Sequence, residues 1–277
     1  MQIKIDNGGV GLALGVDGDG PDLLFVHGLG SAQELWDDMV DGLRGRYRCW
    51  TLDLRGHGAS GRSPGAYTPQ AYASDVAAAL GHIGRPTVGI GHSLGGASLT
   101  RVAVGGHPEL RAVYVIDSTV FRPPRSQTPS AGAFGRILDM LREFQPARRP
   151  VEDYVAWLGS APYVAGGTNA EAFTPARLRG RAESLSQVDA DAIAATLAGY
   201  PSAEPFDPVV SVPYRVVAAD PNLGGSFRPE HDEMLLGFTP HAEVLRLSGV
   251  GHQTLLIRGY DRQILDDLDS WLSRVVS

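Results

Sequence analysis

The chain has 277 residues, of which 43% are apolar and 20% charged, with a formal net charge of −7 and a pI near 5.6. This composition suits one large globular domain, or one domain with a substantial insertion. The acidic balance offers no electrostatic footprint for nucleic acid or anionic lipid, so we expect neither as a partner. The adjacent Arg148 and Arg149 are too short a basic run to change this, and we interpret them as solvent-exposed.

Cys49 is the only cysteine, which excludes an internal disulfide and every multi-cysteine metal site. Its apolar surroundings predict a buried, structural thiol. Residues 1–16 alternate polar and apolar side chains, which predicts a strand rather than a signal peptide. No run approaches the roughly 18 apolar residues that span a bilayer. We therefore expect a soluble, cytoplasmic protein, either a monomer or a homodimer.

Short apolar runs alternate with stretches of helical period through the first 117 residues. The predicted strands are 23–28, 48–54, 86–91 and 112–117, and the predicted helices are 32–44, 69–82 and 94–106. The pattern returns as strands 212–220 and 242–249 and helices 229–237 and 258–275. Strands that alternate with helices predict an α/β fold with a mostly parallel sheet covered on both faces.

Between residues 121 and 208 the alternation stops, and the segment is rich in proline, arginine, alanine and aromatic residues. A structureless loop of this length is implausible in a compact domain. We interpret 121–208 as a helical cap inserted after the sixth strand, and 1–120 with 209–277 as the core domain. Large apolar side chains of this cap could pack it onto the core, and a few could roof a pocket: Phe121, Phe134, Leu138, Met140, Leu141, Phe144, Tyr154, Trp157, Tyr163 and Phe173.

Ser93 lies between Gly91 and Gly95, where the strand 86–91 is predicted to become a helix. Small residues two positions before and after a serine let a strained strand-to-helix turn close, and this turn lifts the hydroxyl above the sheet edge. A glycine-flanked serine can also be a plain helix cap. The strand before it and the small-residue helix after it favour a displayed nucleophile.

A serine hydroxyl is almost fully protonated at neutral pH, so a nucleophilic serine needs a base. Of the eight histidines, only His252 follows the last predicted strand in a turn, and we predict that it is the base. Three others lie at strand ends, where structural and functional interpretations are about equally good: His27, His57 and His92. Four are predicted on the surface: His82, His107, His231 and His241. No pair has H-E-x-x-H spacing, so we predict no metal and no cofactor.

An acyl-transfer intermediate needs two N–H donors aimed at its oxyanion. The N–H of Leu94 supplies one from the start of the helix. Leu29, in the turn between Gly28 and Gly30, can supply the other, because the glycines let the backbone come close. A plain strand-to-helix turn is the other interpretation of this segment.

Four motifs in this order resemble the α/β-hydrolase family, in the branch with a cap domain and a serine nucleophile. FVHGLGSAQELW is similar to its oxyanion loop, LDLRGHGAS to the turn after the next strand, GHSLGG to its nucleophile elbow, and LSGVGHQTLL to its histidine loop. The resemblance implies that Ser93 is the nucleophile, His252 the base, and the backbone of Leu29 and Leu94 the oxyanion hole. Asp53 and Arg55 match positions that hold loops together.

The acid of the triad departs from the family pattern G-D-x-D, because Asn222 occupies the usual slot. Two aspartates that end predicted strands satisfy the family's chain order of serine, acid and histidine. Asp117 lies where haloalkane dehalogenases and certain lactonases have their acid, although a strand-end cap is its other interpretation. Asp220 lies two positions before the usual slot and could simply initiate a turn before Pro221. We favour Asp117.

A serine at the elbow points to acyl transfer rather than to dehalogenation or epoxide opening. We expect a serine hydrolase that acts on a small-molecule partner, an apolar, medium-sized ester or lactone. A substrate that carries a carboxylate, met by arginines of the cap, is a less favoured variant. Two other hypotheses remain: carbon–carbon hydrolysis or lyase chemistry on the same triad, and a ligand-binding receptor built on a hydrolase scaffold.

Overall fold

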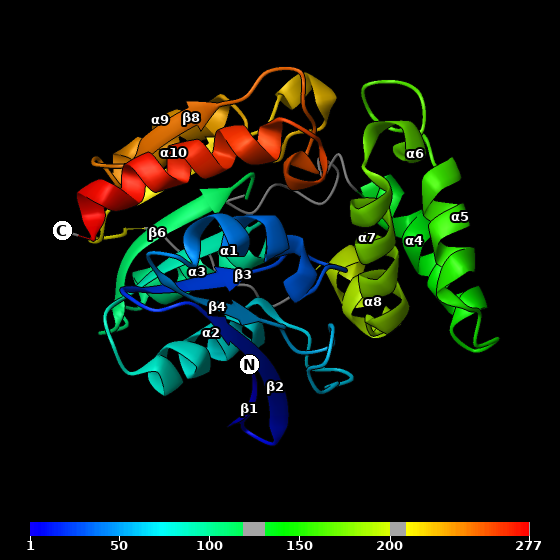
Figure 1. The fold of residues 1–277 in the computed structure, drawn as a ribbon, viewed down its shortest axis with the longest axis horizontal. Coiled ribbons are helices and arrows are strands. Elements are labelled where there is room, and N and C mark those ends of the chain that lie inside the picture. Colours follow the sequence, from blue (N-terminus) through cyan, green and yellow to red (C-terminus); the bar gives the residue numbers. More distant parts are fainter. Residues whose placement is uncertain (119–130, 200–208, 277) are drawn as a thin grey trace.

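The computed structural model describes residues 1–118, 131–199 and 209–276 (Figure 1). Eight strands form one sheet in the order β1-β2-β4-β3-β5-β6-β7-β8. The first two strands run antiparallel to their neighbours, and all other pairs are parallel, so the predicted α/β fold is confirmed. The strands are β1 (Gln2–Asn7), β2 (Val10–Asp17), β3 (Asp22–Val26), β4 (Arg48–Leu52), β5 (Thr87–His92), β6 (Leu110–Ile116), β7 (Tyr214–Ala218) and β8 (Glu243–Arg246).

Helices cover both faces of the sheet because successive strand residues point to opposite sides. Leu24 and Val26 of β3 face one layer of helices, and Leu23 and Phe25 face the other. The first layer holds α2 (Pro69–Ile83), α3 (Leu94–Val104) and α9 (Glu230–Phe238), and the second holds α1 (Asp37–Leu43) and α10 (Tyr260–Val275). Figure 1 shows α1 and α10 side by side over the sheet.

Two predicted elements differ in detail from the structure. The N-terminal stretch is a hairpin rather than one strand, because Gly8 and Gly9 both adopt positive φ angles, of 62° and 87°, and close a two-residue turn. The predicted helix 32–44 is divided into a short 3₁₀ helix, η1 (Gln33–Trp36), and α1.

Among the described residues between β6 and β7, five helices form a layer of their own beside the sheet (Figure 1, green to yellow-green). They are α4 (Ala131–Phe144), α5 (Val151–Ser160), α6 (Asn169–Ala172), α7 (Pro175–Gln187) and α8 (Ala190–Ala198). We call residues 131–198 the helical insertion. Phe121 and both ends of the predicted cap, 121 and 208, lie outside the described residues, and the division into cap and core stays a prediction.

The helical insertion has its own apolar core, which is continuous with loops at the carboxyl ends of the strands. Leu141, Tyr154 and Leu185 are buried in it, and Leu29 and Leu256 of the sheet domain join the same cluster. This packing places the insertion over the edge of the sheet where β5 gives way to α3.

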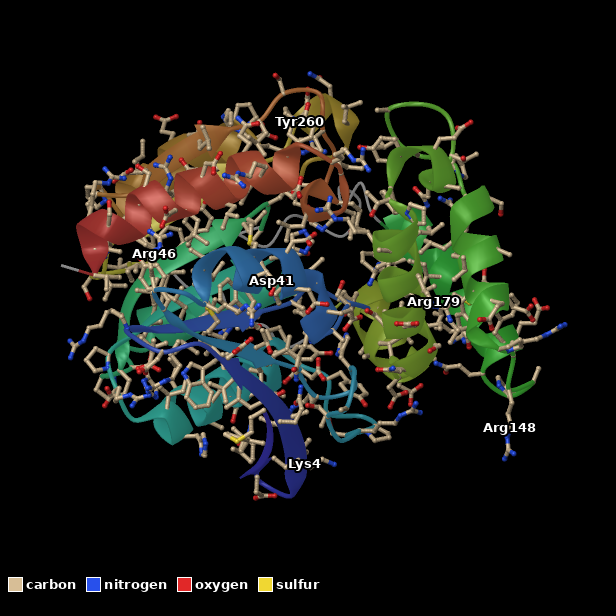
Figure 2. The ribbon with its side chains drawn as sticks, in the orientation of Figure 1. Lys4, Asp41, Arg46, Arg148, Arg179 and Tyr260 are labelled. Atoms are coloured by element: carbon tan, nitrogen blue, oxygen red, sulfur yellow. The ribbon has the colours of Figure 1, made fainter. Side chains whose placement is uncertain are left out.

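Several features of the surface follow the sequence. Arg148 and Arg149 are exposed, and Figure 2 shows Arg148 at the outer tip of the helical insertion. Cys49 is buried as predicted, and burial raises the pKa of its thiol to about 12. Within the described ranges, no helix is both long and apolar enough to cross a bilayer.

Candidate active site

Ser93 stands in a tight turn between β5 and α3. Its backbone has φ 51° and ψ −115°, a conformation that non-glycine residues rarely adopt. A Cβ on Gly91 would lie 2.6 Å from the N of Gly96, and one on Gly95 would collide with the carbonyl oxygen of Val26. Only glycine therefore fits on either side of the serine, as the G-x-S-x-G spacing predicts.

The sheet ladder brings Ser93 and Asp117 to the same edge. His92 pairs with Ile116 in the parallel register of β5 and β6. The N–H of Ser93 donates to the carbonyl of Ile116 at 3.0 Å, and the N–H of Asp117 donates to that of Val217 at 2.7 Å. Both residues thus continue the hydrogen-bond ladder by one step, and both then leave the sheet through a strained turn, since Asp117 has φ 42°.

His252 lies between the two side chains. Its Nε2 is 3.0 Å from Ser93 Oγ, and its Nδ1 is 2.6 Å from Asp117 Oδ2. With the Nδ1 proton donated to the carboxylate, the Nε2 lone pair faces the serine hydroxyl and can accept its proton. This is the geometry of a serine nucleophile, a general base and an orienting acid.

The Asp117 carboxylate is fully buried, and three backbone N–H groups hold it besides His252. It accepts from Ala219 at 3.0 Å, Ser226 at 2.8 Å and Phe227 at 3.2 Å. Burial alone would raise the pKa of Asp117, but the hydrogen bond and charge of His252 and these N–H donors together hold it below the ordinary value. The carboxylate is therefore charged at neutral pH and can stabilise an imidazolium.

Asp220 is placed differently. Its carboxylate accepts hydrogen bonds from the N–H groups of Asn222 and Gly249, each at 2.9 Å, and caps the 3₁₀ helix η3 (Pro221–Leu223). Asn222, in the usual acid slot of the family, is exposed. Neither side chain has a hydrogen bond to His252 in the described part of the chain. Asp220 instead ties the end of β7 to the loop that carries the histidine.

Leu29 and Leu94, the predicted oxyanion donors, lie in the loop after β3 and at the start of α3. Leu94 is the first residue of α3, so its N–H has no acceptor within the helix. No acceptor within the described ranges takes the N–H of Leu29. Gly28 lies directly beside the elbow, because a Cβ there would be 2.8 Å from the His92 ring.

His92 supports the base rather than acting as one. Its Nε2–H donates to the backbone carbonyl of His252 at 3.0 Å, and the two rings lie 4.9 Å apart. Burial and the neighbouring His252 lower the pKa of His92 to about 3, so the ring is neutral. Sequence position alone left its role open, and the contact shows that it holds the histidine loop.

His27 and His57 are also buried and neutral. The Nδ1–H of His27 donates to Gly28, and its Nε2 accepts the N–H of Leu54 at 3.1 Å. Burial lowers the pKa of His27 well below its ordinary value and that of His57 to about 4. The four remaining histidines are exposed or half-buried: His82, His107, His231 and His241. No cluster of potential metal ligands occurs among the residues that the structure describes.

Asp53 and Arg55 stabilise the loops below the site. Asp53 accepts the N–H groups of Gln33 and Ala59, each at 2.9 Å, and so joins two loops. Arg55 forms a buried ion pair with Asp75, with a closest distance of 2.6 Å. These contacts agree with the structural positions that the family resemblance implies.

Three residues of the site were not singled out by number in the sequence, although arginines of the cap were considered as a group. Ser226 Oγ lies 3.1 Å from His252 Nδ1, and Ser118 Oγ donates to the carbonyl of Ser93 at 2.7 Å. Arg181 of α7 donates to the carbonyl of Gly30. Each comes from a segment without a distinctive motif, so spacing could not have found them.

A hollow of about 220 Å³ lies between the helical insertion and His252. Its wall is mostly apolar, with Arg181 as the buried charged residue. Four of the aromatic side chains predicted to roof a pocket line it: Phe134, Trp157, Tyr163 and Phe173. Others from that prediction, Leu138, Met140 and Leu141 among them, are buried in the core of the insertion.

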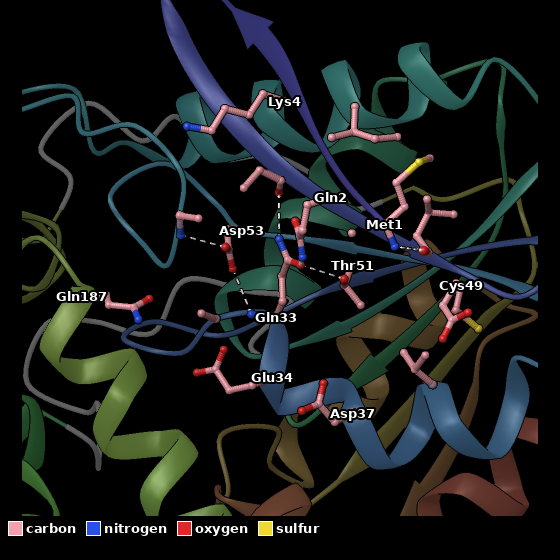
Figure 3. A pocket seen from close by; sticks show the side chains of 18 residues that line it. Met1, Gln2, Lys4, Gln33, Glu34, Asp37, Cys49, Thr51, Asp53 and Gln187 are labelled. Atoms are coloured by element: carbon pink, nitrogen blue, oxygen red, sulfur yellow. Dashed lines mark hydrogen bonds between the residues drawn. The ribbon is translucent and has the colours of Figure 1, made fainter. Parts of the chain in front are cut away.

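A larger hollow of about 670 Å³ lies elsewhere, along β1, β2 and η1. Figure 3 shows that Gln33 crosses it, with hydrogen bonds to Thr51 and Gln2. Neither Ser93 nor His252 is among its lining residues. Of these two hollows, only the smaller is lined by a member of the series Ser93, His252 and Asp117, and that member is His252.

A sequence model described as the alpha/beta hydrolase family matches residues 23–263. The chain belongs to the alpha/beta hydrolase family. Solved structures of similar fold match this chain over nearly its whole length. A hydrolase from Pseudomonas aeruginosa PA01 has a TM-score of 0.75 and 20% identity over 98% of each chain. An E-2-(acetamidomethylene)succinate hydrolase has a TM-score of 0.74 and 21% identity over 99% of each chain.

Curated relatives of this family member match over shorter regions. The 2-(acetamidomethylene)succinate hydrolase of Mesorhizobium japonicum is 32% identical over 120 residues, 43% of each chain. The non-heme haloperoxidase of Rhodococcus erythropolis is 37% identical over 150 residues, 53% of this chain and 54% of that one. The chain thus matches about half the length of these relatives.

Proposed function

We propose that this alpha/beta hydrolase is a serine hydrolase that cleaves a carboxylic ester or lactone through an acyl-enzyme. The observation that carries the proposal is the hydrogen-bonded series Ser93 Oγ, His252 and Asp117, with distances of 3.0 Å and 2.6 Å. The names of the relatives, which include a succinate-derivative hydrolase and an N-formylmaleamate deformylase, support hydrolytic chemistry in general.

In this mechanism Ser93 Oγ attacks the acyl carbon while His252 Nε2 takes the hydroxyl proton. Asp117 stabilises the resulting imidazolium, and the N–H groups of Leu29 and Leu94 receive the oxyanion. His252 then returns the proton to the leaving alcohol as the carbon–oxygen bond breaks. Water, deprotonated by His252, attacks the acyl-enzyme and releases the acid, which regenerates the serine.

The helical insertion acts as the cap in this proposal, because it supplies most of the wall of the hollow at His252. About 220 Å³ is below the roughly 300–1,000 Å³ of pockets for drug-sized ligands, so a short acyl group fits better than a long one. A small-molecule substrate is the one partner that this chemistry needs.

A screen of p-nitrophenyl esters by acyl length, beside a panel of lactones, tests the proposal. We expect hydrolysis that is strongest for short acyl groups, and a loss of at least roughly 10,000-fold in kcat for Ser93→Ala. Ser74→Ala, which removes an exposed hydroxyl on α2, is the matched control. If Ser93→Ala keeps most of the wild-type rate on a substrate, the reaction does not pass through an acyl-enzyme. That result would favour lyase or carbon–carbon chemistry. A protein that is stabilised by ligands but forms no adduct with a serine-directed phosphonate would favour a receptor.

A further inference from the structure

Helix α7 carries three arginines at alternate positions, and they differ in their partners. Two have carboxylate partners: Arg177 pairs with Asp38 and Asp261, and Arg179 pairs with Glu152 and Glu183. Arg181 has no carboxylate oxygen within 4 Å among the described residues, although it is the most buried of the three, with 6% of its surface exposed.

Among the described residues, the hydrogen bonds of Arg181 go only to neutral acceptors of the turn that carries Leu29. One terminal nitrogen donates to the carbonyl of Gly30 and, at 3.0 Å, to the hydroxyl of Ser31; the other lies 3.5 Å from the carbonyl of Leu29. These contacts use three of the five N–H donors of a guanidinium. They satisfy hydrogen bonds, but none of them pairs the positive charge with a carboxylate.

A buried charge is costly unless it is paired with an opposite charge. Burial lowers the pKa of Arg181 to about 10, which leaves the guanidinium charged at neutral pH. Glu34 acts on it through space, but burial raises the pKa of Glu34 itself to about 7, so that carboxyl is only partly charged there. Arg181, whose charge is only partly compensated, lines the same hollow as His252.

We propose that Arg181 binds a carboxylate of the substrate, so that the enzyme prefers the monoester of a short dicarboxylic acid over a neutral ester. This inference rests on the proposed function for the position of the acyl group at Ser93. Because Arg181 contacts the turn of Leu29 and Gly30, a carboxylate held by it lies beside the predicted oxyanion donors. Only a short carbon chain can therefore join the carboxylate at Arg181 to the acyl group at Ser93.

Binding to Ser93→Ala tests the inference without hydrolysis. The probes are monomethyl glutarate, which is anionic, and methyl glutaramate, a neutral amide of nearly the same shape, compared by isothermal titration calorimetry at pH 7.5. We expect the anion to bind about 100-fold more tightly, as a charge-assisted bidentate pair would give. Equal affinities for the two probes would overturn the inference.

Two variants in the Ser93→Ala background locate the effect. Arg181→Gln keeps a donor toward Gly30 and should reduce the preference for the anion to within about 3-fold. Arg179→Gln removes the same charge from an exposed position two residues earlier on α7 and should retain the preference. If Arg181→Gln weakens both probes equally, its role is to hold the turn, and the inference is wrong. If that variant does not fold, the comparison of the two probes in Ser93→Ala decides alone.

The two proposals fail in different ways. If the wild-type protein cleaves neutral p-nitrophenyl esters through Ser93 but the Ser93→Ala variant binds both probes equally, the carboxylate site is refuted and the hydrolase is not. A protein that binds monomethyl glutarate tightly through Arg181 but cleaves no ester or lactone supports the carboxylate site and refutes the hydrolase.

Discussion

β6 and β7 are parallel neighbours, and an aspartate follows each of them. Asp117 contacts His252, whereas Asp220 caps a 3₁₀ helix. Asp117 turns at a positive φ, and its carboxylate is buried against His252. Asp220 stays extended, with φ −65° and ψ 117°, and its carboxylate lies at the surface, where it caps η3. The strand brings a residue to the edge of the site, but the first turn after the strand decides where its side chain points.

The largest expected effect separates these two carboxylates directly. Asp117→Asn should lower kcat roughly 1,000- to 10,000-fold, because a neutral amide cannot stabilise the imidazolium. Asp220→Asn should change kcat by less than about 3-fold, since its carboxylate has no contact with the reacting groups in the described chain. Both are measured with the best ester from the screen. The reverse order of the two effects would contradict the assignment of Asp117.

The family's usual acid position, residue 222, allows a second test of whether Asp117 alone can serve as the acid. Adding Asn222→Asp to Asp117→Asn should leave kcat within about 3-fold of Asp117→Asn alone, because residue 222 is exposed and lies in η3. Asn222→Asp by itself is the control for folding and basal rate. Recovery of a tenth or more of wild-type activity would show that this slot can still reach the histidine.

A further variant tests whether the hydroxyl of Ser226 helps to orient the His252 ring beside Asp117. Ser226→Ala keeps the backbone N–H that donates to Asp117 but removes the hydroxyl 3.1 Å from His252 Nδ1. We expect kcat to fall about 5-fold with KM little changed, as for the loss of one hydrogen bond of about 1 kcal/mol that orients the ring. Unchanged kcat would remove Ser226 from the positioning of the histidine.

The smallest expected effect concerns stability at the β7 end. N–H groups of Gly249 and Asn222 lower the pKa of Asp220 below its ordinary 3.8, so the folded state favours the charged carboxylate. Its contribution to stability is therefore present above pH 3.8 and lost as the pH falls through the lower folded pKa. Asp220→Asn should lower the Tm slightly at pH 7, and in thermal scans the difference should shrink toward zero as the pH is lowered below 3.8. A difference that persists there would not arise from the carboxylate charge.

Local sequence patterns were enough to predict the fold and two residues of the candidate site, Ser93 and His252. Alternating strands and helices predicted the parallel sheet, because apolar periodicity reflects burial on each face. The glycines around Ser93 identified the elbow, since backbone atoms approach too closely for any Cβ. His252 followed from its place after the last strand. These inferences succeed because each depends on neighbours along the chain.

The sequence favoured Asp117 but left Asp220 open; the tertiary structure places the Asp117 carboxylate against His252 and brings Arg181 from the helical insertion to the turn of Leu29. Both facts depend on where side chains point after the chain leaves an element and on which distant element packs there. Neither the direction of a turn nor the contact of residues about 150 positions apart leaves a periodic trace in sequence. The family and the elbow serine were therefore predictable from the chain, whereas the contacts of Asp117 and Arg181 depended on the fold.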